Sequence, residues 1–154
     1  MAIDLEIISP TDKPALIAVS SPEVRDFNRT VLQELGFKVH TATDHQEFIK
    51  RFTSIQYQVV IISELFAATS LSENESLSYM QIAPMNLRRH ASVIMIGDSF
   101  ETLNPMQAFV QSVHAVVNPM DLPSMPQIIQ RVVSDNNLFL NVYRDTQIRI
   151  SQGK

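Results

Sequence analysis

Residues 57–64 read Tyr-Gln-Val-Val-Ile-Ile-Ser-Glu, and this short apolar run constrains the fold more than any other segment. Its four central residues are β-branched and too few for a helix, so we predict a strand that is buried on both faces. Such strands belong to parallel sheets that helices cover on both sides. In these sheets the functional site lies just beyond the carboxyl ends of the strands, and Ser63 ends this strand.

Apolar runs alternate with amphipathic stretches from residue 15 to about residue 133. We predict five strands, each followed by a helix, at residues 15–19, 37–43, 57–63, 92–96 and 114–117. Ser21 and Pro22 can begin the first helix and Gly36 can end it, whereas Pro84 should interrupt the third. The pattern predicts an α/β fold: a three-layer, doubly wound, five-stranded parallel sheet.

The two ends of the chain lie outside this repeat. We therefore divide the chain into an N-terminal extension at 1–13, a main domain at 14–135 and a C-terminal extension at 136–154. Alternating apolar residues make the first extension a candidate extra strand. The second fits either extra strands, which we slightly prefer, or a continuation of the last helix. Phe139 and Tyr143 make it too apolar for a free tail, so it should pack on its own domain or between subunits.

Composition argues against several classes of function. The 154 residues suit one domain, and the apolar content of 45% can build a core. A net charge of −4 disfavours binding to nucleic acid or to anionic membranes. The chain has no cysteine for disulfides or thiolate chemistry. No apolar run approaches the roughly 18 residues of a membrane span, and no basic leader precedes the domain, so we expect a cytoplasmic protein.

The polar residues suggest no catalytic site. The four histidines lack metal-ligand spacing, and three glycines cannot form a phosphate-binding loop. The topology places the histidines mainly at strand starts, opposite Ser63, so a serine hydrolase would lack its base. Glu64 and Asp98 can approach the carboxyl end of the sheet, and we interpret them as solvated loop acids. We predict no catalytic residue, no metal and no cofactor.

Four segments within residues 14–133 resemble landmarks of the receiver domain of bacterial two-component response regulators. Val19-Ser20-Ser21-Pro22 resembles the first-strand motif whose two acids hold Mg²⁺, and residues 57–64 resemble the phosphoacceptor strand. Residues 92–98 resemble the strand that ends in a switch threonine or serine. Residues 115–119 resemble the strand with a switch aromatic and a lysine before a proline. The resemblance implies a flavodoxin-like strand order of 2-1-3-4-5 and a cis bond before Pro119.

Each functional position of that pattern is changed in this chain. The corresponding residues are Ser20 and Ser21 for the metal-binding acids, Ser63 for the phosphoacceptor, Gly97 for the switch hydroxyl, Ala115 for the aromatic and Asn118 for the lysine. Aspartyl phosphorylation needs a carboxylate nucleophile, a cation held by other carboxylates and a positive clamp. The resemblance therefore implies an atypical or pseudo-receiver domain that signals without aspartyl phosphorylation.

Loss of this chemistry directs attention to the surface of the domain. Met106, Phe109, Val110 and Val113 lie on the helix that typical receivers use for partners, although their spacing also fits a core-facing helix. We expect contact with protein partners, including a second copy of the chain in a homodimer. The alternative is a small-molecule sensor, in which the emptied pocket holds a ligand because Gly97 and Ala115 leave room.

Overall fold

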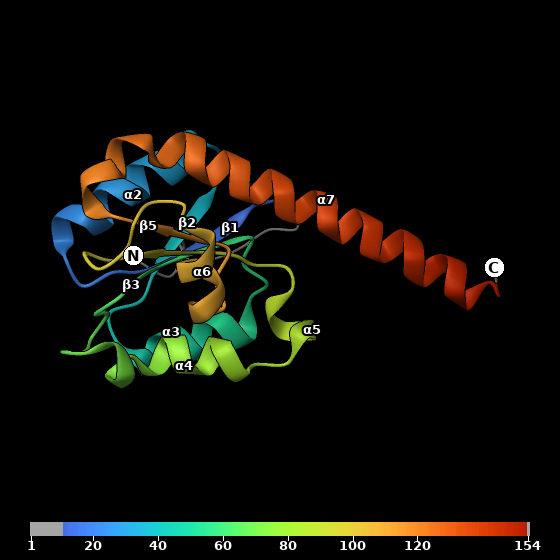
Figure 1. The fold of residues 1–154 in the computed structure, drawn as a ribbon, viewed down its shortest axis with the longest axis horizontal. Coiled ribbons are helices and arrows are strands. Elements are labelled where there is room, and N and C mark those ends of the chain that lie inside the picture. Colours follow the sequence, from blue (N-terminus) through green and yellow to red (C-terminus); the bar gives the residue numbers. More distant parts are fainter. Residues whose placement is uncertain (1–10, 154) are drawn as a thin grey trace.

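The computed structural model describes residues 11–153, which form a five-stranded parallel sheet (Figure 1). The strands are β1 (Pro14–Ala18), β2 (Lys38–Thr41), β3 (Val59–Ser63), β4 (Ser92–Ile96) and β5 (Ala115–Val117). Their order is β2-β1-β3-β4-β5, and every neighbouring pair is parallel. The predicted fold class and strand order are confirmed.

Helices cover both faces of this sheet. On one face lie α2 (Pro22–Glu34) and α7 (Met125–Ser151), and on the other lie α3 (His45–Ser54), α4 (Glu75–Ile82) and α6 (Pro105–Gln111). The short helix α5 (Met85–Arg88) follows α4, from which Pro84 separates it as predicted. Two short 3₁₀ helices, η1 (Leu71–Glu73) and η2 (Pro119–Ser124), complete the described elements.

The core consists of two apolar layers, one on each face of the sheet. In β1, Leu16 and Ala18 point into the layer under α3 and α4, while Ala15 and Ile17 point into the layer under α2 and α7. This alternation follows from the two-residue repeat of a strand. Because both layers are apolar, the central strand carries apolar residues on both faces, which explains the β-branched run of β3.

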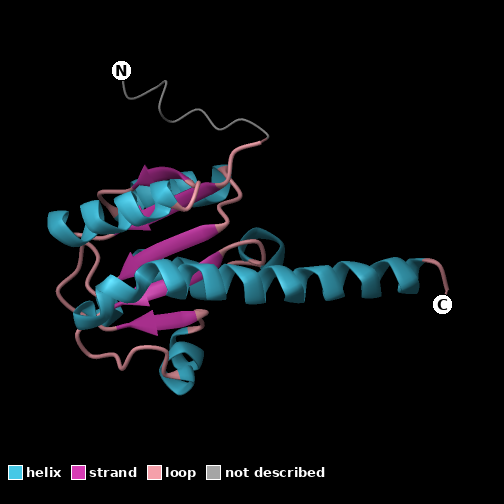
Figure 2. Ribbon diagram, turned by 90° about the horizontal axis from the view of Figure 1, so that it is seen from above, coloured by secondary structure: helices cyan, strands magenta, loops and turns pink. Residues whose placement is uncertain are grey.

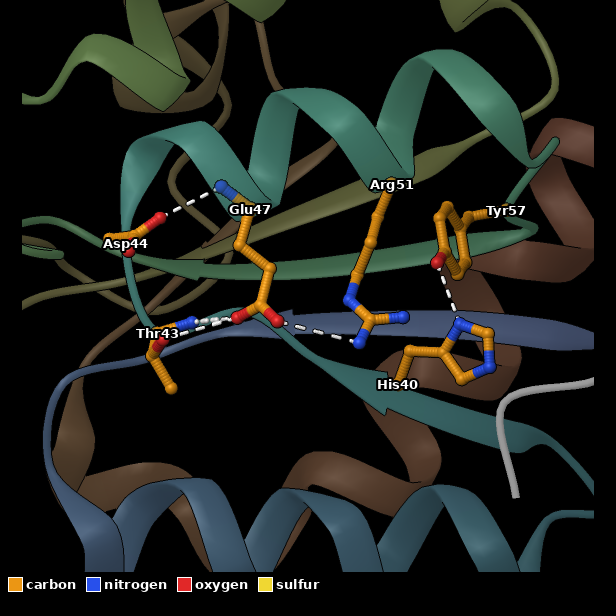
Figure 3. Close-up of polar contacts among 6 residues, drawn as sticks. All are labelled: His40, Thr43, Asp44, Glu47, Arg51 and Tyr57. Atoms are coloured by element: carbon orange, nitrogen blue, oxygen red, sulfur yellow. Dashed lines mark hydrogen bonds and ion pairs between the residues drawn. The ribbon is translucent and has the colours of Figure 1, made fainter. Parts of the chain in front are cut away.

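A polar cluster joins β2, α3 and β3 (Figure 3). The Asp44 side chain accepts a hydrogen bond from the Glu47 amide (2.8 Å), and Glu47 accepts one from the Thr43 amide (2.7 Å), so two backbone donors at the start of α3 are satisfied. A buried hydrogen bond of 2.8 Å links His40 Nδ1 to the Tyr57 hydroxyl. These contacts hold an edge strand of the sheet to the helix that covers it.

The C-terminal extension is helical, and the preferred strand interpretation is wrong. Helix α7 runs without a break for 27 residues, and its second half projects beyond the body of the domain (Figure 2). Asn136 does not end the helix because it lies on the buried stripe that also contains Ile129, Val132 and Leu140. The N-terminal extension lies largely outside the described residues, so its predicted strand stays a prediction.

The Asn118–Pro119 peptide bond is trans, which corrects the expected cis bond. The Asn118 side chain accepts a hydrogen bond from the Met120 amide (3.0 Å) and begins η2, in which Pro119 is the first residue. A proline at this position suits a trans-linked helix start because its missing amide is not needed there.

Candidate functional site

The sheet brings most of the predicted pocket residues to one edge. Ser20 and Ser21 follow β1, Ser63 ends β3, Gly97 follows β4 and Asn118 follows β5, so all five lie at the carboxyl ends of the strands. Ala115 does not join them. It begins β5 and is buried in the core layer under α7, so a residue at this position contributes to packing and not to a pocket.

The two serines at the metal-acid positions serve the backbone. Ser20 Oγ accepts a hydrogen bond from the Ala67 amide at 2.9 Å, which ties the loop after β1 to the loop after β3. Ser21 Oγ accepts a hydrogen bond from the Val24 amide at 3.5 Å and caps α2. Among the described residues, no group of histidine, aspartate and glutamate side chains is arranged to hold a metal ion.

The Ser63 hydroxyl has little to activate it. Its Oγ atom is buried and has no hydrogen-bond partner within residues 11–153. A nucleophilic serine needs a base within hydrogen-bond distance. Because the structure places no such group beside this hydroxyl in the described part of the chain, Ser63 has the properties of a strand-end packing residue.

The side chain of Glu64 fills the space beside Gly97, a role that the sequence interpretation missed. A Cβ atom at position 97 would lie 2.8 Å from Glu64 Cβ and 3.0 Å from Phe100 Cδ2, and would also meet Glu64 Oε1. Ser99 Oγ donates a 2.5 Å hydrogen bond to Glu64 Oε2. The strand register explains this contact. Ser63 of β3 pairs with Ile96 of β4, so the residues that follow them, Glu64 and Gly97, are neighbours. Asp98, in contrast, is exposed as predicted.

Asn118 braces a loop in place of a positive clamp. Its Nδ2 atom donates to the carbonyl oxygens of Asp98 (3.3 Å) and Phe100 (3.0 Å), both in the loop between β4 and α6. Its Oδ1 atom accepts from the Met120 amide. The Asn118 side chain is therefore hydrogen-bonded to backbone groups of other residues in the domain. Glu64 fills the space that a ligand beside Gly97 would need.

The predicted interaction face is largely exposed. The exposed fractions of Met106, Phe109 and Val110 on α6 are 68%, 79% and 66%, whereas Val113 packs against the core. Beside Phe109 and Val113 lies a hollow of about 650 Å³ between α5, α6 and α7, which Phe139 also lines. Exposed apolar side chains next to a hollow of this size are typical of interaction surfaces.

One end of this hollow carries positive charge. The guanidinium of Arg88 donates to the carbonyl oxygens of Met80 (2.8 Å) and Ser112 (2.5 Å), and burial lowers its pKa. His114 Nδ1 accepts a hydrogen bond from the Val93 amide at 3.0 Å. Burial of the ring and the nearby charge of Arg88 lower the pKa of His114, and a hydrogen bond with Asn136 opposes them. By surface area, however, His114 as a whole is an exposed residue, so solvent screens these effects.

The projecting half of α7 adds apolar surface. Leu138, Phe139, Val142, Ile148 and Ile150 are each more than half exposed. The guanidinium of Arg89 lies over the Tyr143 ring at 4.3 Å from its centroid, so the body contacts the extension there. No helix in the described part of the chain is long and apolar enough to span a membrane.

Comparisons with known proteins agree with this architecture. A receiver domain protein (CheY-like) from Methanospirillum hungatei gives a TM-score of 0.63 at 16% identity over 82% of this chain and 98% of that chain. The chemotaxis response regulator CheY4 of Vibrio cholerae gives 0.60 at 17% identity, over 79% and 99%. NtrX from Brucella abortus in complex with ADP gives 0.67 at 14% identity, over 94% of this chain but 30% of that chain.

The comparison by sequence gives no match: neither a protein-family model nor a curated protein matches this chain. The structural likeness, at identities below a fifth, is a likeness of fold. The chain thus has the CheY-like receiver fold.

Proposed function

We propose that this chain is a receiver-like signalling module that acts through protein–protein contact without aspartyl phosphorylation. The proposal is supported mainly by the side chains at the carboxyl ends of the strands, which are occupied by hydrogen bonds and packing. The hydroxyls of Ser20 and Ser21 bind backbone amides, and the amide of Asn118 braces a loop. Glu64 occupies the space beside Gly97. Together these residues supply packing where phosphoryl transfer would need charge and room.

The electrostatics oppose phosphoryl transfer at this edge. A phosphoryl group brings negative charge, which a cation and a lysine must neutralise. Here the charged side chains beside Gly97 are acids, Glu64 and the exposed Asp98, and neutral serines hold the positions of the cation ligands. A hard cation such as Mg²⁺ binds through grouped carboxylates, and the described residues contain no such group.

The exposed face of α6 is the proposed contact surface. Met106, Phe109 and Val110 present apolar side chains to solvent beside the hollow at α5 and α7. Aromatic and methionine side chains are enriched at the centres of interfaces, and Phe109 is well placed to be such an anchor. We propose that a protein partner, in the first instance a second copy of this chain, covers this face in a bacterial cytoplasm.

Phosphoryl uptake tests the first half of the proposal. The purified chain is incubated with acetyl phosphate and Mg²⁺, and intact mass spectrometry follows the addition of a phosphoryl group. We expect no addition to the wild-type chain, and a typical receiver domain measured in parallel serves as the positive control. Stoichiometric, Mg²⁺-dependent uptake by this chain would refute the proposal.

A further inference from the structure

We propose that Glu64 is a built-in latch, whose carboxylate holds the loop between β4 and α6 in one position without any phosphoryl group. Its consequence for the α6 face rests on the function proposed above. The latch itself consists of contacts made by the Glu64 backbone, the Glu64 carboxylate and the loop at residues 97–104.

The backbone of Glu64 is fixed at both ends of its peptide. Its amide donates to the Ile96 carbonyl at 2.7 Å, which extends the pairing of β3 with β4 by one residue. Its carbonyl accepts from Asn74 Nδ2 at 3.2 Å. The half-buried side chain therefore starts from a fixed point and lies over Gly97, where the absence of a Cβ atom leaves space for it.

The carboxylate then connects this fixed point to α6. Ser99 Oγ donates to Glu64 Oε2 at 2.5 Å, and the Ser99 carbonyl accepts from Gln107 Nε2 at 3.4 Å. Gln107 belongs to α6, and its Oε1 atom accepts from the Glu101 amide at 2.7 Å. A continuous series of hydrogen bonds thus runs from the end of β3, through the loop, to the helix that carries Phe109.

The other side of the loop is braced as well. Asn118 donates to two loop carbonyls, as described above, and its own amide donates to Thr102 Oγ1 at 2.9 Å. Between these braces Leu103 has φ of +63°, which is uncommon for any residue except glycine. A residue keeps such a conformation only when its surroundings hold it there. The braces on both sides identify the loop as a segment held in one conformation.

The chemistry of a carboxylate suits this role. Hydrogen bonds to an ionised acceptor are about twice as strong as neutral ones. Because the Glu64 carboxylate belongs to the chain itself, the loop and α6 need no phosphoryl group to be held. The exposed face of α6 is then held in the same position at all times, and a mutation at Glu64 makes the loop and α6 mobile.

Hydrogen exchange of the full chain, followed by mass spectrometry, tests the latch. We compare Glu64→Ala, Glu64→Gln and Ser99→Ala with the wild-type chain, and use Glu73→Ala as a control. Glu73 is an exposed acid that accepts a side-chain hydrogen bond from Thr69, outside the β4–α6 loop. The readout is the exchange rate of peptides covering 98–111, relative to peptides covering α2.

We expect Glu64→Ala and Ser99→Ala to accelerate exchange at 98–111 by about tenfold, the change expected when a hydrogen bond to a charged group is lost. Glu64→Gln should give a smaller acceleration, and Glu73→Ala none. Unchanged exchange at 98–111 in both Ser99→Ala and Glu64→Ala would overturn the latch. Equal acceleration in α2 would overturn it too, because that result indicates general destabilisation. Neither outcome depends on acetyl-phosphate labelling, so the latch and the proposed function can fail separately.

Discussion

Replacement of Gly97 by alanine should destabilise this domain because of crowding and not because of backbone strain. The glycines with positive φ in the described residues are Gly36 and Gly153, so Gly97 has a backbone conformation that alanine accepts. The added methyl group, however, would lie 2.8 Å from Glu64 Cβ and 3.0 Å from Phe100 Cδ2, and closer still to Glu64 Oε1. These neighbours are packed and must move.

Two effects of opposite sign set the size of the change. Replacing glycine by alanine at a compatible site raises the free energy of unfolding by about 0.4–1 kcal/mol, because it lowers the conformational entropy of the unfolded chain. An extra methyl group in a packed site costs about 1–3 kcal/mol. Because the contacts with Glu64 are shorter than real Cβ contacts, crowding should prevail. We expect a net loss of about 1–2 kcal/mol, which lowers the Tm of a domain of this size by about 2–8 °C.

A double-mutant cycle in urea measures whether Glu64 is the obstacle. Glu64→Gly removes both nearby Glu64 atoms, so the cost of Gly97→Ala should fall by about 1 kcal/mol or more in that background. Glu64→Ala keeps its Cβ atom and should relieve less. Glu73→Ala, at an exposed acid outside the β4–α6 loop, should leave the cost unchanged. If the Gly97→Ala and Glu64→Gly effects simply add, the packing described for Glu64 is wrong.

Three further predictions follow from single contacts. Since the pKa of His114 is lowered, the unfolded chain binds a proton more readily than the folded chain. Stability should therefore fall as the pH drops below about 6.5, and His114→Asn should flatten this loss, as thermal melts at several pH values will show. Ser63→Asp should take up no phosphoryl group from acetyl phosphate by intact mass, because neither metal acids nor a lysine accompany it. Tyr57→Phe should cost about 1 kcal/mol in urea unfolding, since it removes a buried hydrogen bond to His40.

The sheet was predictable from sequence because its signals are local. The β-branched run of β3 and the proline and serine at the start of α2 need no knowledge of distant residues. The strand order came with the resemblance to receiver domains, and the structure confirms it.

The prediction for the C-terminal extension was wrong because one pattern fits two structures. The apolar residues of 138–150 satisfy a two-residue period and a helical period about equally, and only packing of Leu140 and Asn136 against the body favours the helix. In the same way, the spacing of Met106, Phe109 and Val110 fits either a core or an exposed face. Their exposure depends on how α6 is oriented on the sheet, which a single sequence does not encode locally.

The role of Glu64 was missed for a different reason. Its neighbours Gly97 and Ser99 lie more than thirty positions away in the sequence, and they meet it through the pairing of β3 with β4. A glycine at the end of one strand and an acid at the end of the next are unremarkable separately. Their joint meaning appears only when the register is known.

Sedimentation velocity measures both whether copies of the chain associate and whether that association depends on phosphorylation. The wild-type chain, Phe109→Ser and, as a control on the opposite face of the sheet, Phe27→Ser are each compared with and without acetyl phosphate and Mg²⁺. We expect the wild-type chain to be a dimer with or without acetyl phosphate. Phe109→Ser should dissociate this dimer, and Phe27→Ser should retain it. A monomer that dimerises only after addition of acetyl phosphate and Mg²⁺ would contradict the proposed function.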